Sequence, residues 1–275
     1  MGATDEIAVV RLDLSDALAG LALSTEAHWN QNEADWRCFL TKGIVFGVRD
    51  KGGVLIGTAA LLPYTSNQAW ISMVLVTASC RRRGIATKLV DACLDAATKL
   101  GLTSWLDATP AGTTVYRPLG FVPDLQLRRL RREPTLPAQT GARLAGCDID
   151  EFVTRDANAM GFDRSALLNE LVGRPGSRLL SIGEAKALVR DGRTTRHVGP
   201  LFAGNAQSAL ALLDEIVRDE ARPALIDAIE SQREFLDGLT ASGWIIERPF
   251  QRMRFGCSPT DSKDFAFAVA GPEYG

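Results

Sequence analysis

The spacing of apolar residues divides the first half of the chain into short strands and amphipathic helices. Residues 69–76 are almost continuously apolar, which is typical of a strand buried on both faces at the centre of a sheet. Directly after it, Ile85, Leu89 and Cys93 recur at helical spacing, and Gly101 follows the last turn, where glycine commonly ends a helix. The pattern therefore predicts a buried strand, a loop and a helix in succession. We also expect strands at 7–12, 44–48, 54–62, 105–107 and 121–130, a helix that starts within 13–16, and helices at 32–40 and 112–117.

The second half repeats part of this order. It predicts a strand at 194–203 and then an amphipathic helix over 206–217, with Asn205 as its N-cap. Residues 225–228 echo 106–108, and residues 243–254 echo 120–129. Because two echoes occur in the same order, they indicate an internal duplication.

The segment between the two halves has the composition of a linker. At 275 residues the chain is longer than a usual single domain of roughly 100 to 200 residues. Charged residues, Pro134, Pro137 and Gly141 are gathered within 131–141, as in an exposed connection. We therefore predict two domains, residues 1–133 and 141–275.

Composition and charge exclude several classes of function. The net charge is −2 and the pI is about 5.8, so there is no overall basic surface for nucleic acid or an anionic membrane. The longest apolar stretch, at 54–62, is shorter than the roughly 20 residues that span a bilayer. The five cysteines are scattered and form no C-x-x-C pair, which is typical of reduced thiols. With two histidines in the chain, we expect no zinc site. We expect a cytoplasmic protein without a metal, a nucleic-acid partner or a membrane partner.

The loop between the buried strand and the helix has the residues of an anion site. Backbone N–H groups at a helix N-terminus, together with the helix dipole, favour a pyrophosphate, and arginine adds charge that can pair with it. Glycine in such a loop lets the backbone approach the phosphates. Neither a P-loop nor a Rossmann fingerprint is present. The loop residues are Arg81, Arg82, Arg83, Gly84, Ile85, Ala86 and Thr87.

This loop resembles the R/Q-x-x-G-x-G/A signature of the GNAT acetyltransferases. Arg81, Gly84 and Ala86 fall at the signature positions, with alanine where many members have glycine. The resemblance implies an α/β (α+β) fold with a mixed central sheet flanked by helices, and acetyl-CoA as the cofactor. It also implies that the backbone of Val74, Leu75 and Val76, at the end of the preceding strand, binds the pantetheine arm and polarises the thioester carbonyl.

A second element supports the same resemblance. Residues 116–121 are similar to the Y-x-x-x-G-F element that occurs late in this domain of the family. The resemblance implies that Tyr116 protonates the departing thiolate as a general acid. The alternative is a tyrosine that only packs beneath the last strand.

The acceptor and the general base are less defined. An alkyl amine with a pKa near 10 needs about 4 kcal/mol to lose its proton at pH 7, so a base or a water chain is required. Glu33, Asp35 and Asp107 are candidates by region, and the alternative for each is a carboxylate in a helix cap, in a turn or at the surface. Trp29, Asn30, Asp35 and Asp107 are candidate acceptor-binding residues, for which helix packing is the alternative.

The second half lacks both the arginine-containing loop and the tyrosine. Its strand meets its helix at 203–206 without an arginine, and Leu239 stands where Tyr116 stands in the first half. It resembles the degenerate GNAT-like domain of tandem acetyltransferases, whose G-F/W…R-P-F-x-R-M run matches residues 243–253. We expect this domain to bind no CoA and to form one wall of the acceptor cleft, with Asp227, Glu230 and Arg196 as candidate lining residues.

Two functions follow from the residues and the resemblance. The first is an acetyl-CoA-dependent N-acetyltransferase whose acceptor, a small molecule or a peptide, offers a primary amine for direct attack in a ternary complex. The second is a non-enzymatic acyl-CoA or metabolite sensor on a GNAT fold. The sequence predicts neither the acceptor nor the oligomeric state.

Overall fold

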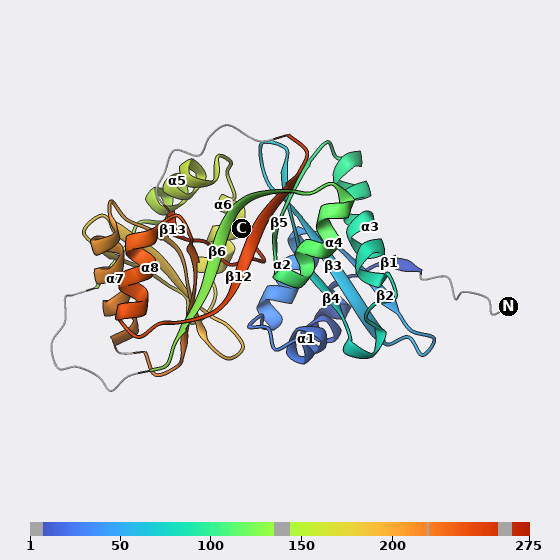
Figure 1. Ribbon diagram of the computed structural model, residues 1–275, viewed down its shortest axis with the longest axis horizontal. Helices are drawn as coiled ribbons and strands as arrows, with labels where there is room; N and C mark the ends of the chain where they lie inside the picture. Colours follow the sequence, from blue (N-terminus) through green and yellow to red (C-terminus); the bar gives the residue numbers. More distant parts are fainter. Residues whose placement is uncertain (1–7, 135–143, 219, 258–265) are drawn as a thin grey trace. The chain divides into compact units, whose positions relative to one another are not determined.

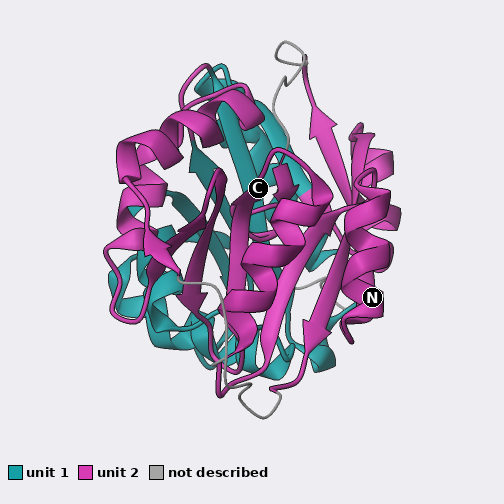
Figure 2. Ribbon diagram, turned by 90° about the vertical axis from the view of Figure 1, so that its left-hand side faces the viewer, with its two compact units in different colours: residues 1–63, 67–106 teal, residues 64–66, 107–275 magenta. Residues whose placement is uncertain are grey.

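The computed structural model describes residues 8–134, 144–218, 220–257 and 266–275. The chain divides into two compact units, which Figure 2 colours separately. The first unit comprises residues 1–63 and 67–106, and the second comprises residues 64–66 and 107–275.

The first unit contains a mixed sheet in the order β1–β2–β3–β4–β5. Neighbouring strands are antiparallel from β1 to β4, and β4 and β5 are parallel. Asp50, whose carboxylate accepts the N–H groups of Gly52 and Val54, closes the hairpin between β2 and β3. The strands are β1 (Val9–Arg11), β2 (Ile44–Arg49), β3 (Leu55–Pro63), β4 (Gln68–Val76) and β5 (Thr103–Ala108), whose last two residues belong to the second unit.

Helices α1 (Ala17–Glu26), α2 (Glu33–Lys42) and α3 (Ile85–Lys99) pack against this sheet. A capping box between Asn32 and Asp35 begins α2. The indole of Trp36 lies directly against Gly20 and donates to Ser24 Oγ at 2.9 Å, which joins α1 to α2 in the core. Apolar side chains of α3 cover Gly57 of β3.

The second unit contains a larger mixed sheet in the order β12–β6–β11–β13–β10–β9–β8–β7, in which β10 also pairs with β11. β6 is antiparallel to both β11 and β12. The strands are β6 (Val122–Arg132), β7 (Ala145–Gly146), β8 (Arg178–Ile182), β9 (Ala185–Asp191), β10 (Arg196–Phe202), β11 (Ala224–Ile229), β12 (Ile245–Phe255) and β13 (Ala266–Ala268).

Helices cover both faces of this second sheet. α7 (Ala206–Arg218) and α8 (Arg233–Ala241) lie side by side on one face, where their apolar residues share a core with β9, β10 and β11 (Figure 1). On the opposite face, Phe152 of α5 (Ile149–Met160) packs edge-on against Phe202 of β10, with ring centroids 5.4 Å apart. The remaining helices are α4 (Pro110–Tyr116) and α6 (Ser165–Val172).

The elements expected from the first half of the sequence are present, and most of their ends differ by one to three residues. Sequence patterns did not predict α5, α6, β8, β9 or β13. β6, which we assigned to the first domain by its place in the chain, pairs instead with β11 and β12 of the second unit. The domain boundary expected within 131–141 falls largely outside the described residues and stays a prediction.

Candidate functional site

The loop between β4 and α3 has an unusual backbone. After a single 3-10 turn at Ala78–Cys80, Arg82 and Gly84 adopt left-handed conformations, with φ of 62° and 78°. Gly84 is the N-cap of α3 and, as a glycine, offers no side chain to cap the N–H groups of the first helical turn. An uncapped helix N-terminus behind such a loop is suited to bind an anion.

The three arginines of this loop are exposed, and two of them donate to backbone carbonyl oxygens. Arg81 Nε donates to Val76 O at 3.0 Å, and Arg83 donates to Ser79 O at 3.1 Å. A Cβ atom on Gly84 would meet no heavy atom within 4 Å. In the structure the glycine is therefore required by its positive φ. The close approach of a phosphate, which we expected from the sequence, remains a prediction.

Glu26, the last residue of α1, binds the start of this loop, and sequence reasoning missed it. Its carboxylate accepts the N–H of Ala78 at 2.7 Å and the hydroxyl of Thr77 at 2.7 and 3.0 Å. The hydrogen bond from Ala78 and that from Thr77 lower the pKa of Glu26. A negative charge in the last turn of a helix is unfavourable next to the negative end of the helix dipole. The position of Glu26 was therefore a local indication that this residue has a partner elsewhere in the chain.

The end of β4 has one open edge. Met73 has a φ of 51°, and the register with β3 shifts there. Beyond this bulge, Leu75 and Val76 still pair with β3. The pairing of β4 with β5 covers only 68–70 and 103–105 among the described residues. On the β5 side, residues 74–76 therefore have no strand partner among the described residues. The resemblance requires such an unpaired edge in a strand that binds pantetheine.

Tyr116 is the last residue of α4 and is buried. A Cβ atom on Gly112 would lie 2.9 Å from the Tyr116 ring, so glycine makes room for it one turn earlier. The ring of Phe121 lies 5.9 Å away. These contacts fix the ring, and the role of its hydroxyl as a general acid stays a prediction.

The carboxylates considered as bases all have structural partners. Both oxygens of Asp107 accept hydrogen bonds from Arg252, at 2.9 Å each, and burial raises the pKa of Asp107 against the influence of this arginine. Asp35 is the capping-box residue of α2, and Glu33 accepts from Arg37 at 2.8 Å.

The segment between α1 and α2 remains a candidate for acceptor binding. Trp29 and Asn30 are half-buried, whereas Trp36 belongs to the core. Gln31, the next residue of this segment, is buried, and its side-chain oxygen has no hydrogen-bond partner among the described residues. Acceptor binding by Trp29 and Asn30 stays a prediction.

The three residues proposed to line the acceptor cleft from the second half form ion pairs within the second unit. Asp227 accepts from Arg129 at 2.7 and 2.8 Å and lies 2.9 Å from His197 Nε2. Glu230 pairs with Arg128, and Arg196 pairs with two acidic residues, of which Glu220 lies 3.1 Å away. Their role toward an acceptor stays a prediction.

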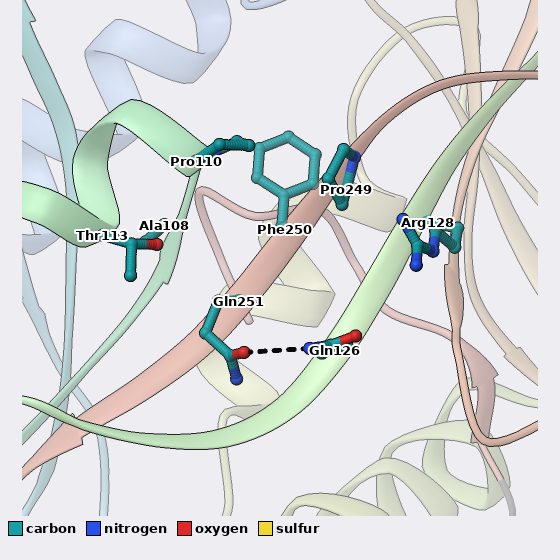
Figure 3. A pocket seen from close by; sticks show the side chains of 8 residues that line it. All are labelled: Ala108, Pro110, Thr113, Gln126, Arg128, Pro249, Phe250 and Gln251. Carbon is teal, nitrogen blue, oxygen red and sulfur yellow. Dashed lines mark hydrogen bonds between the residues drawn. The ribbon is translucent and has the colours of Figure 1, made fainter.

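A cavity of about 220 Å³ lies in the second unit beside the start of α4 (Figure 3). Gln126 of β6 and Gln251 of β12 are opposite each other in the strand register, and their side chains point toward each other and are joined by a hydrogen bond of 3.3 Å. Its volume is below the roughly 300 Å³ at which ligand pockets begin, so it suits a small group. Its lining consists of Ala108, Pro110, Thr113, Gln126, Arg128, Pro249, Phe250 and Gln251.

Within the described ranges, no group of three or more His, Cys, Asp or Glu side chains is arranged to hold a metal ion. The described helices include none that is long and apolar enough to cross a membrane.

Comparisons with known proteins match both halves of the chain. Residues 13–121 match the model of the acetyltransferase (GNAT) family, and residues 152–268 match an acetyltransferase (GNAT) domain. No curated protein sequence matches the chain.

Similar solved structures include three proteins that span nearly the whole chain. A provisionally assigned acetyltransferase of Pyrococcus horikoshii has a TM-score of 0.83 at 20% identity, over 100% of this chain and 98% of its own. A tandem GNAT protein from the clavulanic acid biosynthesis pathway has a TM-score of 0.66 at 19% identity, over 93% and 100%. A GCN5-related N-acetyltransferase of Sphaerobacter thermophilus has a TM-score of 0.63 at 15% identity, over 92% and 96%. At these identities the likeness shows the fold.

Proposed function

Because the chain belongs to the GNAT family of acetyltransferases and carries two such domains in tandem, we propose that it is an acetyl-CoA-dependent N-acetyltransferase. The acceptor is a primary amine of a small molecule or a peptide. The family uses acyl-CoA donors in general, and the choice of the acetyl group is part of the proposal.

The observation that carries the proposal is the uncapped N-terminus of α3. Arg82 and Gly84 have left-handed backbone conformations, and Gly84, the N-cap, has no side chain to cap the first N–H groups of this 15-residue helix. A pyrophosphate would satisfy these donors, and the exposed guanidinium groups of Arg81 and Arg83 add positive charge beside them. The open edge of Val74–Val76 is consistent with the same ligand.

In the proposed reaction the amine nitrogen attacks the thioester carbonyl carbon. A C–N bond forms, the C–S bond breaks, and the amide and the free thiol of CoA are the products. Backbone N–H groups of 74–76 stabilise the oxyanion, and Tyr116 supplies a proton to the thiolate. The proton released by the amine goes to a base that we do not assign, because the carboxylates nearest in the chain are held in caps and ion pairs.

The caps and ion pairs that hold these carboxylates favour a second candidate function. If no base is available, the protein binds acyl-CoA without catalysis and acts as a sensor.

Calorimetry with acetyl-CoA, followed by an assay of thiol release with a panel of primary amines, tests both functions. The enzyme is expected to bind one acetyl-CoA per chain and to release thiol with at least one class of amine. Binding of acetyl-CoA without thiol release for any class of amine would support the sensor function. Absence of binding would contradict the proposed cofactor site. Binding of two equivalents would contradict the expectation that the second half binds no CoA.

A further inference from the structure

Residues 266–269 lie inside the sheet of the second unit, and residues 271–275 form a turn that follows them. Ala268 of β13 is opposite Leu201 of β10 on one side and opposite Ala228 of β11 on the other. The N–H of Val269 continues the pairing, because it donates to the carbonyl oxygen of Asp227 at 3.0 Å. The segment therefore separates two strands that pair directly with each other over 196–198 and 224–226.

The first unit has the same local arrangement without such a segment. β4 and β5 pair in parallel over three residues, as β10 and β11 do. Each first strand then shifts register at a residue with positive φ, Met73 at 51° in β4 and Gly199 at 153° in β10. In the described part of the first unit, no strand pairs with 74–76 on the side of β5. This is the edge to which we assign the pantetheine arm.

We propose that residues 266–275 are an internal ligand of the second unit and occupy the position that a pantetheine arm would take there. The extended part of the segment, residues 266–269, offers N–H and C=O groups like those of the amides of that arm, so it pairs with the facing edges of both strands. The segment thereby excludes acyl-CoA from the second unit. This inference rests on the proposed cofactor edge of the first unit, but not on catalytic activity.

The space between β10 and β11 fits a peptide backbone with small side chains. A Cβ atom on Gly199 would lie 2.1 Å from the carbonyl oxygen of Val269, so only glycine allows the segment to approach β10 this closely. Ala268 and Ala270 are fully buried, which leaves no space for a larger side chain at these positions.

Two buried arginines hold the end of the segment. Arg190 donates to the carbonyl oxygen of Ala270 at 2.6 Å and to Glu273 at 2.7 Å. Its guanidinium lies 5.2 Å from the centre of the Tyr274 ring, which is fully buried.

Arg164 holds the last two residues. It pairs with both oxygens of Asp156 at 2.8 Å and donates to the carbonyl oxygens of Tyr274 and Gly275. Since these contacts go mainly to backbone oxygens, they recognise a chain in one conformation, as a ligand site does.

Hydrogen exchange of the full chain, without CoA, tests the assignment in two variants that displace the segment from opposite sides. Ala268→Glu puts a charge into the gap, and Gly199→Ala obstructs the wall. Amides of 266–269 and those of Leu201, Phe202 and Ala228 are expected to exchange at least about tenfold faster, while α7 and α8 keep their protection. A synthetic peptide of residues 266–275 should restore the protection of Leu201, Phe202 and Ala228 in Ala268→Glu. It should not do so in Gly199→Ala, because the added Cβ atom obstructs the peptide in the same way.

Matched controls are Ala241→Glu, at an exposed helix end, and Gly204→Ala, where a Cβ atom has ordinary space. Both should exchange like the unchanged chain. Unchanged exchange in Ala268→Glu and Gly199→Ala would overturn the proposal. So would a rise throughout the second unit in both variants, because the segment would then be an integral strand of one cooperative core. Since no CoA is used, these outcomes are independent of the acetyltransferase proposal.

Discussion

Arg252 donates two hydrogen bonds of 2.9 Å to the carboxylate of Asp107, and neither side chain is appreciably exposed. Arg129 repeats this bidentate geometry with Asp227, at 2.7 and 2.8 Å. Both aspartates lie in the echoed segments of the sequence, one in β5 and one in β11. The repeated ion pair is therefore a structural counterpart of the internal duplication.

Removal of one partner of such a pair is expected to be costly. Arg252→Met leaves the Asp107 carboxylate buried without a counter-charge, and we expect a loss of about 3–5 kcal/mol in the free energy of unfolding. Arg37→Met, in the exposed Glu33 pair, should cost less than about 1 kcal/mol. Urea unfolding measures both. Adding Asp107→Asn to Arg252→Met should recover part of the loss, and equal stabilities of the two single variants would contradict this account.

Gly84→Val should weaken cofactor binding. Gly84 has a φ of 78°, which a β-branched residue adopts only with strain, so the loop in front of α3 must change. We expect the dissociation constant of acetyl-CoA to rise at least about tenfold, or about 1.4 kcal/mol. Gly53→Val is a matched control, because Gly53 has a φ of 80° and equally open surroundings in the β2–β3 hairpin. The same affinity in both folded variants would refute the assignment of this loop.

Tyr116→Phe should lower kcat and leave cofactor affinity nearly unchanged. The ring contacts with Gly112 and Phe121 persist in phenylalanine, and only the hydroxyl is lost. General acid catalysis contributes roughly 10²- to 10⁴-fold, and a thiol leaving group with a pKa near 8.5 needs it less, so we expect a decrease of about 10- to 10³-fold. Tyr64→Phe, which loses a hydrogen bond to Tyr274 O, is the control and should keep its turnover. Normal turnover of Tyr116→Phe would leave Tyr116 a packing residue.

Stability should decrease in mildly acidic solution because of His197. Burial, and then the charge of Arg190, lower the pKa of its imidazole below the usual 6.5. Below about pH 6.5 the unfolded chain takes up a proton that the folded chain does not, which reduces the free energy of unfolding by up to about 1.4 kcal/mol per pH unit. Urea unfolding between pH 7.5 and 5.5 should show a smaller pH dependence for His197→Gln. Parallel pH profiles would mean that another group is responsible.

The sequence by itself determined the parts of the protein that depend on neighbouring residues. The left-handed glycine before α3, the capping box of Asn32 and Asp35, and the turn at Asp50 are each defined within a few residues. Local hydrogen bonds and backbone preferences act over such short separations, so features of this kind form without a partner from elsewhere in the chain. The candidate cofactor loop and Tyr116, whose roles stay predictions, were singled out through motifs that are continuous in the chain.

Tertiary structure alone decided which distant segments became neighbours. Glu26 binds Ala78 across 52 positions and Arg252 binds Asp107 across 145, and β6 pairs with strands that follow it by about 100 residues. No local pattern distinguishes an arginine with a buried partner from one in solvent. The strand 266–268 likewise has an ordinary apolar sequence, and its position between β10 and β11 is determined only by its pairing with these strands. Pairing of this kind depends on the shape and the unsatisfied backbone groups of the assembled sheet, which no single stretch of sequence contains.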